Sequence, residues 1–311
     1  MASPGAAAAL PLARPLLTRR ARERLMGYLY LLPVAVCLGG TIAFPILKAM
    51  HMSLYQHVLF KPREYGFIGA GNYVRLLHDE TFWLTLRNSF VWVFGSVSLQ
   101  FVGGFAAALL LHQNFRGRAF VRTVTLLPWI IPGVVVALVW EWLYQPNYGV
   151  INDLLLRLGW LHERVAWLSD PVLAMPAVIA ANVWRGVPFF AIMLLAGLQA
   201  IPDELYEAAR VDGAGVVQRF VSITLPLLRP IIVVATATRI IWTFNYADLI
   251  FVMTSGGPAN ATQITSTYTL LTAYSTLDFG YAATLSVVLL VIMLGFTMLY
   301  LRVTRGIEHV A

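Results

Sequence analysis

Long apolar stretches separated by short polar ones make up most of the chain. A helix needs roughly 20 mostly apolar residues to cross about 30 Å of hydrocarbon. Six segments have this length and character, and three of them, residues 25–47, 88–115 and 279–301, contain no Asp, Glu, Lys or Arg. The pattern therefore predicts an all-α membrane protein with six transmembrane helices.

The other three predicted spans share one feature, a charged side chain inside the apolar run. They are residues 123–144 with Glu141, residues 172–201 with Arg185, and residues 231–253 with Arg239 and Asp248. Burying a charge in lipid is costly, so such side chains usually face protein or water. Each of these charges is a candidate either for transport or for holding the helices together.

Composition supports a membrane protein and excludes several other classes. Hydrophobic residues make up 59% of the chain and charged residues 12%, far from the balance of a soluble globular domain. With Cys37 as the single cysteine and six scattered histidines, we expect no intrachain disulfide and no metal site. The basic residues are spread over separate loops, which indicates contact with membrane lipid rather than nucleic acid.

The positions of the basic residues predict the orientation. Arginines gather in the loops on the side of the N-terminus, and cytoplasmic loops are the ones enriched in Lys and Arg. We therefore expect both termini in the cytoplasm, and the basic stretch "LTRRARERL" as an anchor rather than part of a signal peptide. The predicted organisation is a tail of residues 1–24, a six-helix domain of residues 25–303 with a cytoplasmic loop 202–230, and a tail of residues 304–311.

The fifth predicted span carries a polar stripe. Arg239 and Asp248 are nine positions apart, about 900 degrees of helical rotation, so a continuous helix would place them on opposite sides. Trp242, Asn245 and Asp248 would share one face. An aromatic plate beside polar groups suits the handling of a sugar. The alternative is that Asn245 and Asp248 hold the bundle by interhelical hydrogen bonds and that Trp242 packs.

The fourth and third predicted spans offer further candidates. Arg185, with Asn182 one turn before it, either serves a substrate pathway or pairs with an acid on a partner subunit. Arg239 has the same two interpretations. Glu141 lies near the outer end of its span, where a carboxylate reaches water, and a structural role is favoured for it.

A polar loop interrupts the apolar pattern at "EAARVDGAGVVQRFVSITLPLLRP", residues 207–230. Pro202 followed by two acidic residues predicts a short helix over residues 202–211. Asp212 is placed to cap a second short helix, which Pro226 and Pro230 would end before the fifth span. The simplest interpretation is an amphipathic connector at the membrane surface.

The same loop resembles the EAA loop of permease subunits in bacterial ABC importers, at matching spacing. The motif residues are Glu207-Ala208-Ala209, Asp212-Gly213-Ala214, Gln218, Phe220 and Ile223-Thr224-Leu225-Pro226. "FNYADLIFVMTSGGPANAT", residues 244–262, is similar to the carbohydrate-uptake subfamily related to the maltose and glycerol-phosphate permeases. The resemblance runs from about residue 25 to 303.

The resemblance implies the type I importer permease fold and a division of labour. A second, related permease would complete a heterodimer, two ATPase subunits would bind the loops, and a periplasmic or lipid-anchored solute-binding protein would deliver substrate. The residues implied in coupling to the ATPase are Glu207, Ala208, Ala209, Asp212 and Gly213. The chain contains no G-x-x-x-x-G-K-[ST] phosphate loop, so we expect it to be no enzyme and to bind no cofactor, with ATP and magnesium on the ATPase.

The implied substrate is a mono- or oligosaccharide. The alternative within the same importer class is glycerol 3-phosphate or another polyol or anionic solute. A membrane enzyme would need a convergent acid-base or metal cluster, and a self-contained secondary transporter would show paired broken spans or an internal repeat. The sequence shows neither pattern, so both classes are minor alternatives.

Overall fold

The computed structural model describes residues 19–308, with side chains over residues 26–304. The chain divides into two units at His51 and Met52. The first unit holds α1 (Arg19–Leu38), a π-helical turn (Gly39–Ala43) and most of α2 (Phe44–Met52). The stretch Met26–Met52 is long and apolar enough to cross a membrane, which agrees with the first predicted span.

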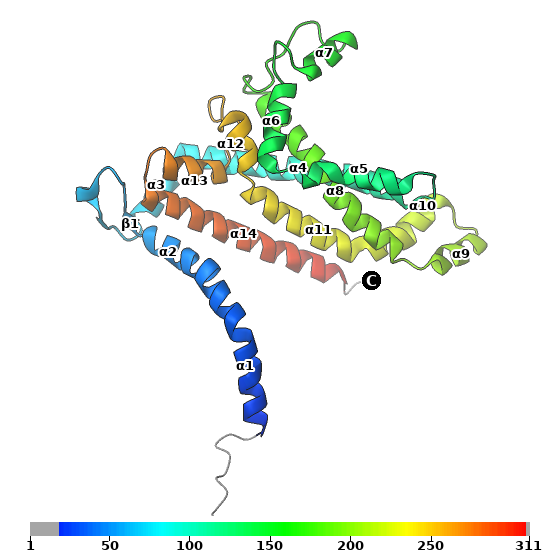
Figure 1. Ribbon diagram of the computed structural model, residues 1–311, viewed down its shortest axis with the longest axis horizontal. Helices are drawn as coiled ribbons and strands as arrows, with labels where there is room; N and C mark the ends of the chain where they lie inside the picture. The colour runs from blue at the N-terminus through cyan, green and yellow to red at the C-terminus, as the bar shows by residue number, and fades with distance from the viewer. Residues whose placement is uncertain (1–18, 309–311) are drawn as a thin grey trace, which may run out of the picture. The chain divides into compact units, whose positions relative to one another are not determined.

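The second unit is almost entirely helical (Figure 1). A two-stranded antiparallel hairpin of β1 (Tyr55–Gln56) and β2 (Gly66–Phe67) precedes the helices. The helices, in chain order, are α3 (Gly71–Leu77), α4 (Glu80–His112), α5 (Arg118–Ile130), α6 (Gly133–Leu143), α7 (Val150–Arg157), α8 (Ala174–Gln199), α9 (Asp203–Val211), α10 (Val216–Arg219), α11 (Leu225–Asn245), α12 (Asp248–Thr254), α13 (Thr265–Tyr274) and α14 (Phe279–Glu308).

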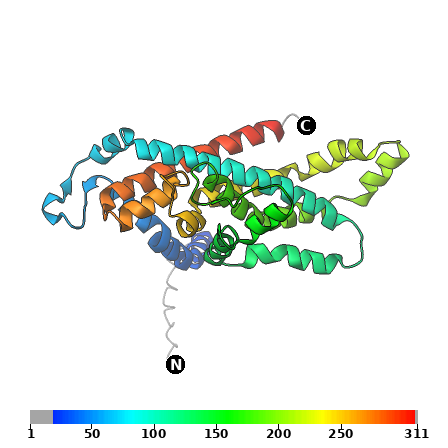
Figure 2. The same cartoon turned by 90° about the horizontal axis from the view of Figure 1, so that it is seen from above.

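The core lies where α4 packs lengthwise against α8, with α11 alongside (Figure 2). Trp92 on α4 and Phe190 and Leu194 on α8 are completely buried. Gly104 lets the two helices approach closely, because a Cβ atom there would collide with Phe190 and the Val187 carbonyl. Small residues at such crossings are typical of membrane helix packing.

The six-span prediction is confirmed with one change. Within residues 19–308, five helices are long and apolar enough to cross a membrane, and the bent pair of α5 and α6 brings the number to six if it forms one span. The prediction of a single helix over residues 123–144 is wrong, because the chain bends by 95° between Ile130 and Gly133. Pro132, in an extended conformation at this break, has no N–H to continue the helix.

The predicted second short helix after Gly213 is not a separate element. Helical structure runs without a break from Val216 to Asn245 and contains a π-helical turn at Phe220–Thr224. A proline ring normally clashes with the carbonyl four residues earlier, and for Pro226 that carbonyl lies in the π turn. The wider turn relieves the clash, so Pro226 does not end the helix.

The fifth predicted span is also interrupted at its other end. α11 ends at Asn245 and α12 begins at Asp248, with Tyr246 and Ala247 between them. The rotation expected for a continuous helix therefore does not apply across Arg239 and Asp248. This break sets the geometry of the site described below.

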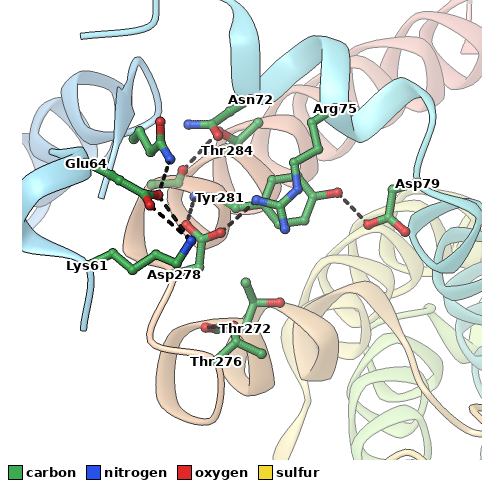
Figure 3. A network of polar contacts seen from close by, with 12 residues as sticks. Lys61, Glu64, Asn72, Arg75, Asp79, Thr272, Thr276, Asp278, Tyr281 and Thr284 are labelled. Atoms are coloured by element: carbon green, nitrogen blue, oxygen red, sulfur yellow. Dashed lines mark hydrogen bonds and ion pairs between the residues drawn. The ribbon is translucent and has the colours of Figure 1, made fainter. Parts of the chain in front are cut away.

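A network of polar side chains joins α3, α4, α13 and α14 at one end of the bundle (Figure 3). Asp79 accepts hydrogen bonds from the hydroxyls of Tyr268, at 2.7 Å, and Tyr281. Arg75 pairs with Asp278 at 2.7 Å and lies over the Tyr281 ring, 4.0 Å from its centre. Within this network, which we call the tyrosine network, each charged group has a partner.

Asp79 is also the N-cap of α4, where its carboxylate accepts the backbone N–H of Thr81 at 2.9 Å. Burial alone would raise the pKa of Asp79, but hydrogen bonds from Tyr281, Tyr268 and the backbone outweigh it and hold the pKa below its usual value. The ionised carboxylate is therefore the form that the fold stabilises.

Candidate functional site

A cavity of about 260 Å³ lies where α5, α8 and α11 meet. We call it the arginine cavity. It is lined by Trp129, Arg185, Arg239, Trp242, Thr243 and Tyr246. The structure thus brings Arg185 and Trp242, both predicted as pathway residues, to one place.

Helix breaks surround the arginine cavity. α5 ends at Ile130, one residue after Trp129, and α11 ends at Asn245, just before Tyr246. α6 begins at Gly133, where a Cβ atom would collide with the Tyr246 hydroxyl. Interrupted helices inside a membrane are tolerated where they are enclosed by protein or line a cavity, and they recur at transporter binding sites.

Arg239 is buried and held from one side. Its Nε donates to Oε1 of Gln100 at 2.6 Å, and Nε2 of Gln100 donates to the backbone carbonyl of Asn182 at 2.9 Å. Gly186 leaves the room for this arrangement, because a Cβ atom there would collide with Gln100 and the Arg239 guanidinium. The chain of contacts fixes Arg239 between α4 and α8.

Arg185 approaches the cavity from α8. Its guanidinium lies 4.9 Å from the centre of the Tyr246 ring, a cation–π arrangement. Its Nε is buried without a hydrogen-bond partner. Within residues 26–304, neither Arg185 nor Arg239 forms an ion pair with a carboxylate.

Two further polar side chains lack partners among the described residues. The Tyr246 hydroxyl, in the cavity lining, is buried without a hydrogen bond, and so are both side-chain polar atoms of Asn182, which precedes Arg185 by one turn of α8 but does not line the cavity. Buried polar groups in proteins are nearly always satisfied, so each exception calls for a physical explanation. A polar ligand with several hydroxyls would supply the missing partners.

Aromatic rings form the apolar part of the wall. Trp242 is 47% exposed, and its ring packs 5.4 Å from that of Phe189. Trp129 lies 6.3 Å from the same phenylalanine. The cavity therefore combines flat aromatic surfaces with hydrogen-bond donors, a combination suited to the apolar face and the hydroxyls of a sugar.

Asn245 and Asp248 lie elsewhere, so the predicted stripe with Trp242 is split. Both line a second cavity of about 450 Å³ between α12, α13 and α14. The amide of Asn245 donates to the Ile241 carbonyl at 3.0 Å and contacts the Met293 sulfur at 3.5 Å. Asp248 is exposed in the first turn of α12.

Glu141 lines a third and larger cavity of about 690 Å³ with loop residues that follow α6 and α12. It is half-buried and lies two turns along α6 from Gly133. Among the described residues, no group of three His, Cys, Asp or Glu side chains could hold a metal ion.

The predicted loop helix is present as α9. Pro202 stands at its N-cap, and Asp203 and Glu204 occupy its first turn. Asp212 is the C-cap of α9 and does not cap the next helix, whose N-cap is Gly215. The prediction for Asp212 as an N-cap is therefore wrong.

Gly213 makes the bend between α9 and α10. Its φ is +80°, in the left-handed region, although a Cβ atom there would meet nothing within 4 Å. The requirement at Gly213 is thus conformational rather than steric. Tyr206 of α9 bonds Thr224 at 2.9 Å, which ties the bent loop back to the base of α11.

The outer side of this loop is accessible. Glu207 and Ala208 are exposed, and Ala209 is half-buried. Large apolar side chains are exposed beside them, namely Leu205, Val211, Val216 and Val217. Such a patch on an otherwise polar loop indicates a contact surface.

Reasoning from the sequence missed Gln100, Trp129 and Tyr246 as members of the site. A signal existed for Gln100, an amide in the middle of a predicted span whose other amides lie at its ends. Tyr246 follows Asn245 directly, but only the helix break turns it toward Arg185. Trp129 lies in the stretch "LLPWIIP", residues 126–132, which resembles a signature of the family but does not by itself place the ring at this site.

Comparison with known proteins agrees with this architecture. Residues 100–309 match the family model described as "Binding-protein-dependent transport system inner membrane component". The chain is 41% identical to the trehalose/maltose transport system permease protein MalF of Thermococcus litoralis, covering 91% of this chain and 95% of the relative. It is 37% identical to the sulfoquinovosyl glycerol transport system permease protein SmoG of Agrobacterium fabrum, covering 91% of each.

A solved structure shows the same fold. A chain of a bacterial ABC transporter involved in the import of the acidic polysaccharide alginate has a TM-score of 0.81 and 25% identity, covering 93% of this chain and 98% of that one. The family model covers more than half of the chain, and the similarity extends over nearly its whole length. The chain belongs to the family of binding-protein-dependent transport system inner membrane components.

Proposed function

We propose that this chain is the permease subunit of an ATP-driven importer and forms half of the pathway for a carbohydrate. The arginine cavity carries the proposal, since aromatic walls and unpartnered polar atoms meet there between broken helices. The relatives support it, because their names specify trehalose and maltose, sulfoquinovosyl glycerol and diacetylchitobiose. Alginate, the cargo of the similar structure, is also a carbohydrate.

The side chains of the cavity take distinct roles in this proposal. Trp129 and Trp242 stack on the apolar face of a sugar ring. Tyr246 and Arg185 donate hydrogen bonds to its hydroxyls. Asn182, buried outside the lining of the cavity, offers both a donor and an acceptor beside the pathway. Asn245 and Asp248 line the second cavity as an additional stretch of the pathway.

The loop of residues 202–230 couples transport to ATP hydrolysis on a separate ATPase subunit. Glu207, Ala208 and Ala209 present the contact surface, and Asp212 and Gly213 set the bend behind it. The exposed valines around Glu207 support this role, because an ATPase cleft would cover them. ATP and magnesium would be held by the ATPase, with none bound by this chain.

The assembly in this proposal has four further subunits. They are a second, related permease, two ATPases and a solute-binding protein on the outer side, with the loop and both termini in the cytoplasm. One solved alginate importer is in complex with its substrate-bound periplasmic protein, which supports the binding-protein partner. A self-contained carrier would need none of them.

Co-purification tests the assembly. Tagged chain is extracted from native membranes in mild detergent after crosslinking, and the proteins recovered with it are identified by mass spectrometry. We expect an ATPase and a second permease, and ATP-dependent sugar uptake once the complex is reconstituted with its binding protein. Recovery of the chain alone would contradict the proposal.

Coupling is tested by a matched pair of glycine variants. Gly213→Ala forces a left-handed conformation on a side chain, which costs about 1–2 kcal/mol and distorts the bend. Gly215→Ala is the control, because Gly215 has a φ of −68° and open space around it. We expect Gly213→Ala to lower ATP-driven uptake at least tenfold, or about 1.4 kcal/mol, and Gly215→Ala to leave it nearly unchanged. Equal uptake by the two variants would argue against a coupling role for the bend.

A further inference from the structure

We propose that the transported carbohydrate carries an anionic group, which Arg185 and Arg239 bind in the arginine cavity. The inference rests on the proposed function and adds the chemical class of its substrate: a sugar bearing a carboxylate, sulfonate or phosphate. Three observations support it. The two arginines lack a carboxylate partner, they have hydrogen-bond donors that are not used, and the N-terminus of α6 lies beside the cavity.

The positive charge of the arginine cavity is not neutralised by a carboxylate in its lining. Two guanidinium groups converge on it, and one of them, Arg239, is 4% exposed. No Asp or Glu is among the residues that line it, and the intramembrane carboxylates Asp248 and Glu141 line other cavities. A buried cation without a counter-ion is strongly unfavourable, so a cationic site of this kind is suited to an anion that arrives with the ligand.

The donors of both arginines remain available. Gln100 binds only Nε of Arg239, and neither terminal nitrogen of that guanidinium donates to a described residue. The guanidinium carbon of Arg185 lies 4.9 Å from the centre of the Tyr246 ring, and its Nε has no hydrogen-bond partner among the described residues. Guanidinium edges bind carboxylate, sulfonate and phosphate oxygens in paired, charge-assisted hydrogen bonds.

The start of α6 adds positive potential at the same place. α6 begins at Gly133 after the extended Pro132, and no side chain caps it. A Cβ atom added at its first residue would collide with the hydroxyl of Tyr246, which lines the cavity. The unpaired backbone N–H groups of a helix N-terminus favour anions, so this end reinforces the two arginines.

The remaining surface restricts the ligand to a sugar-like molecule. Trp129, Trp242 and Tyr246 offer flat faces, and Thr243 adds a hydroxyl-bearing side chain at the wall. The volume of about 260 Å³ lies just below the range of typical small-molecule sites, which begins near 300 Å³. One charged sugar unit, rather than a long neutral chain, matches this space.

Paired probes test the charge directly. The detergent-purified permease pair is titrated with galactose and galacturonate, glucose and 6-deoxy-6-sulfoglucose, and glycerol and glycerol 3-phosphate, and binding is followed by calorimetry. We expect at least one anionic probe to bind at least tenfold more tightly than its neutral twin. Measuring binding to the permeases avoids the selectivity of the solute-binding protein.

Variants assign the effect to the cavity. Arg185→Gln should remove most of the tenfold preference, because it should weaken binding of the anionic probe far more than binding of its neutral twin. Arg157→Gln, which deletes an equal charge from the exposed surface of α7, should leave both affinities unchanged. Because Arg239 is buried, the affinities of Arg239→Gln are used only if this variant has the melting temperature of the wild type. The result for Arg185→Gln is sufficient as the test without it.

The outcomes separate the inference from the proposed function. If no anionic probe gains affinity over its neutral twin, or if Arg185→Gln weakens both twins equally, the anionic inference is overturned. A carboxylate of the second permease that neutralises both arginines would produce the first of these results. ATP-driven uptake of a neutral sugar by the complete importer would still support the proposed function, whereas loss of all sugar uptake would contradict it.

Discussion

Two polar regions of this permease are built in opposite ways. In the tyrosine network, Asp79 accepts from two tyrosines and Arg75 pairs with Asp278. In the arginine cavity, Arg185 and Arg239 have no carboxylate partner among the described residues. A network whose polar groups all have hydrogen-bond partners stabilises the fold, whereas a cavity with unpaired donors is suited to binding a ligand. The two regions should therefore respond in opposite ways to substitution.

The largest expected effect is on stability at Asp79. Asp79→Ala removes the N-cap of α4, worth about 1 kcal/mol, and leaves two tyrosine hydroxyls without their acceptor. We expect a loss of about 2–4 kcal/mol, measured by thermal unfolding in detergent. The neighbouring exposed Glu80 provides the control, and Glu80→Ala should change stability by less than about 1 kcal/mol. Similar losses of stability for Asp79→Ala and Glu80→Ala would show that the tyrosine network does not stabilise the fold more than an exposed neighbour does.

The next effect is on ligand binding at Arg185. Arg185→Gln should weaken binding of galacturonate about tenfold, or 1.4 kcal/mol, because one charge-assisted contact is lost. Its melting temperature should stay equal or rise, since no carboxylate loses a partner when the charge is removed. A clear fall in melting temperature would place Arg185 with Asp79 as a structural residue.

A smaller effect is expected with pH, and it belongs to the tyrosine network alone. Because the pKa of Asp79 is held below its usual value of about 3.9, its contribution to stability is complete above that value. The contribution disappears as the pH falls through the lowered pKa. Melting temperatures measured from about pH 6 to pH 3 should therefore show the deficit of Asp79→Asn narrowing toward the acid end. A constant deficit would indicate that the ionised carboxylate is not the stabilising form.

The smallest effect is expected at the second cavity. Asn245 already bonds within its own helix and contacts Met293, and Asp248 is exposed. Asn245→Ala and Asp248→Asn should each change galacturonate affinity by no more than about twofold, or 0.4 kcal/mol. A tenfold change at either residue would move the binding site from the arginine cavity toward α12.

The sequence predicts the parts of this molecule that depend on local pattern. Apolar runs give the spans, Pro202 with its acidic neighbours gives α9, and Gly213 gives the bend. The sequence does not predict that the helix breaks at Pro132 and after Asn245 lie beside the same cavity. Whether a proline in an apolar run ends or merely bends a helix depends on the helices that pack around it.

Long-range contacts set the rest of the site. Gln100 and Arg239 are 139 residues apart in the chain, and no local pattern joins them. Trp242 and Arg185 are correct as candidates because an aromatic and a charge stand out in apolar spans. Their shared cavity depends on α8 and α11 meeting at Gly186, which only the tertiary structure shows.

The most direct test compares Asp79→Ala and Arg185→Gln in one preparation of the permease pair. Melting temperature and galacturonate affinity are measured for both variants and for the wild type. We expect Asp79→Ala to lower the melting temperature while the folded fraction keeps its affinity. We expect Arg185→Gln to keep the melting temperature and to lose about tenfold in affinity. If both variants change the same quantity, the division between a structural network and a ligand-binding cavity is contradicted.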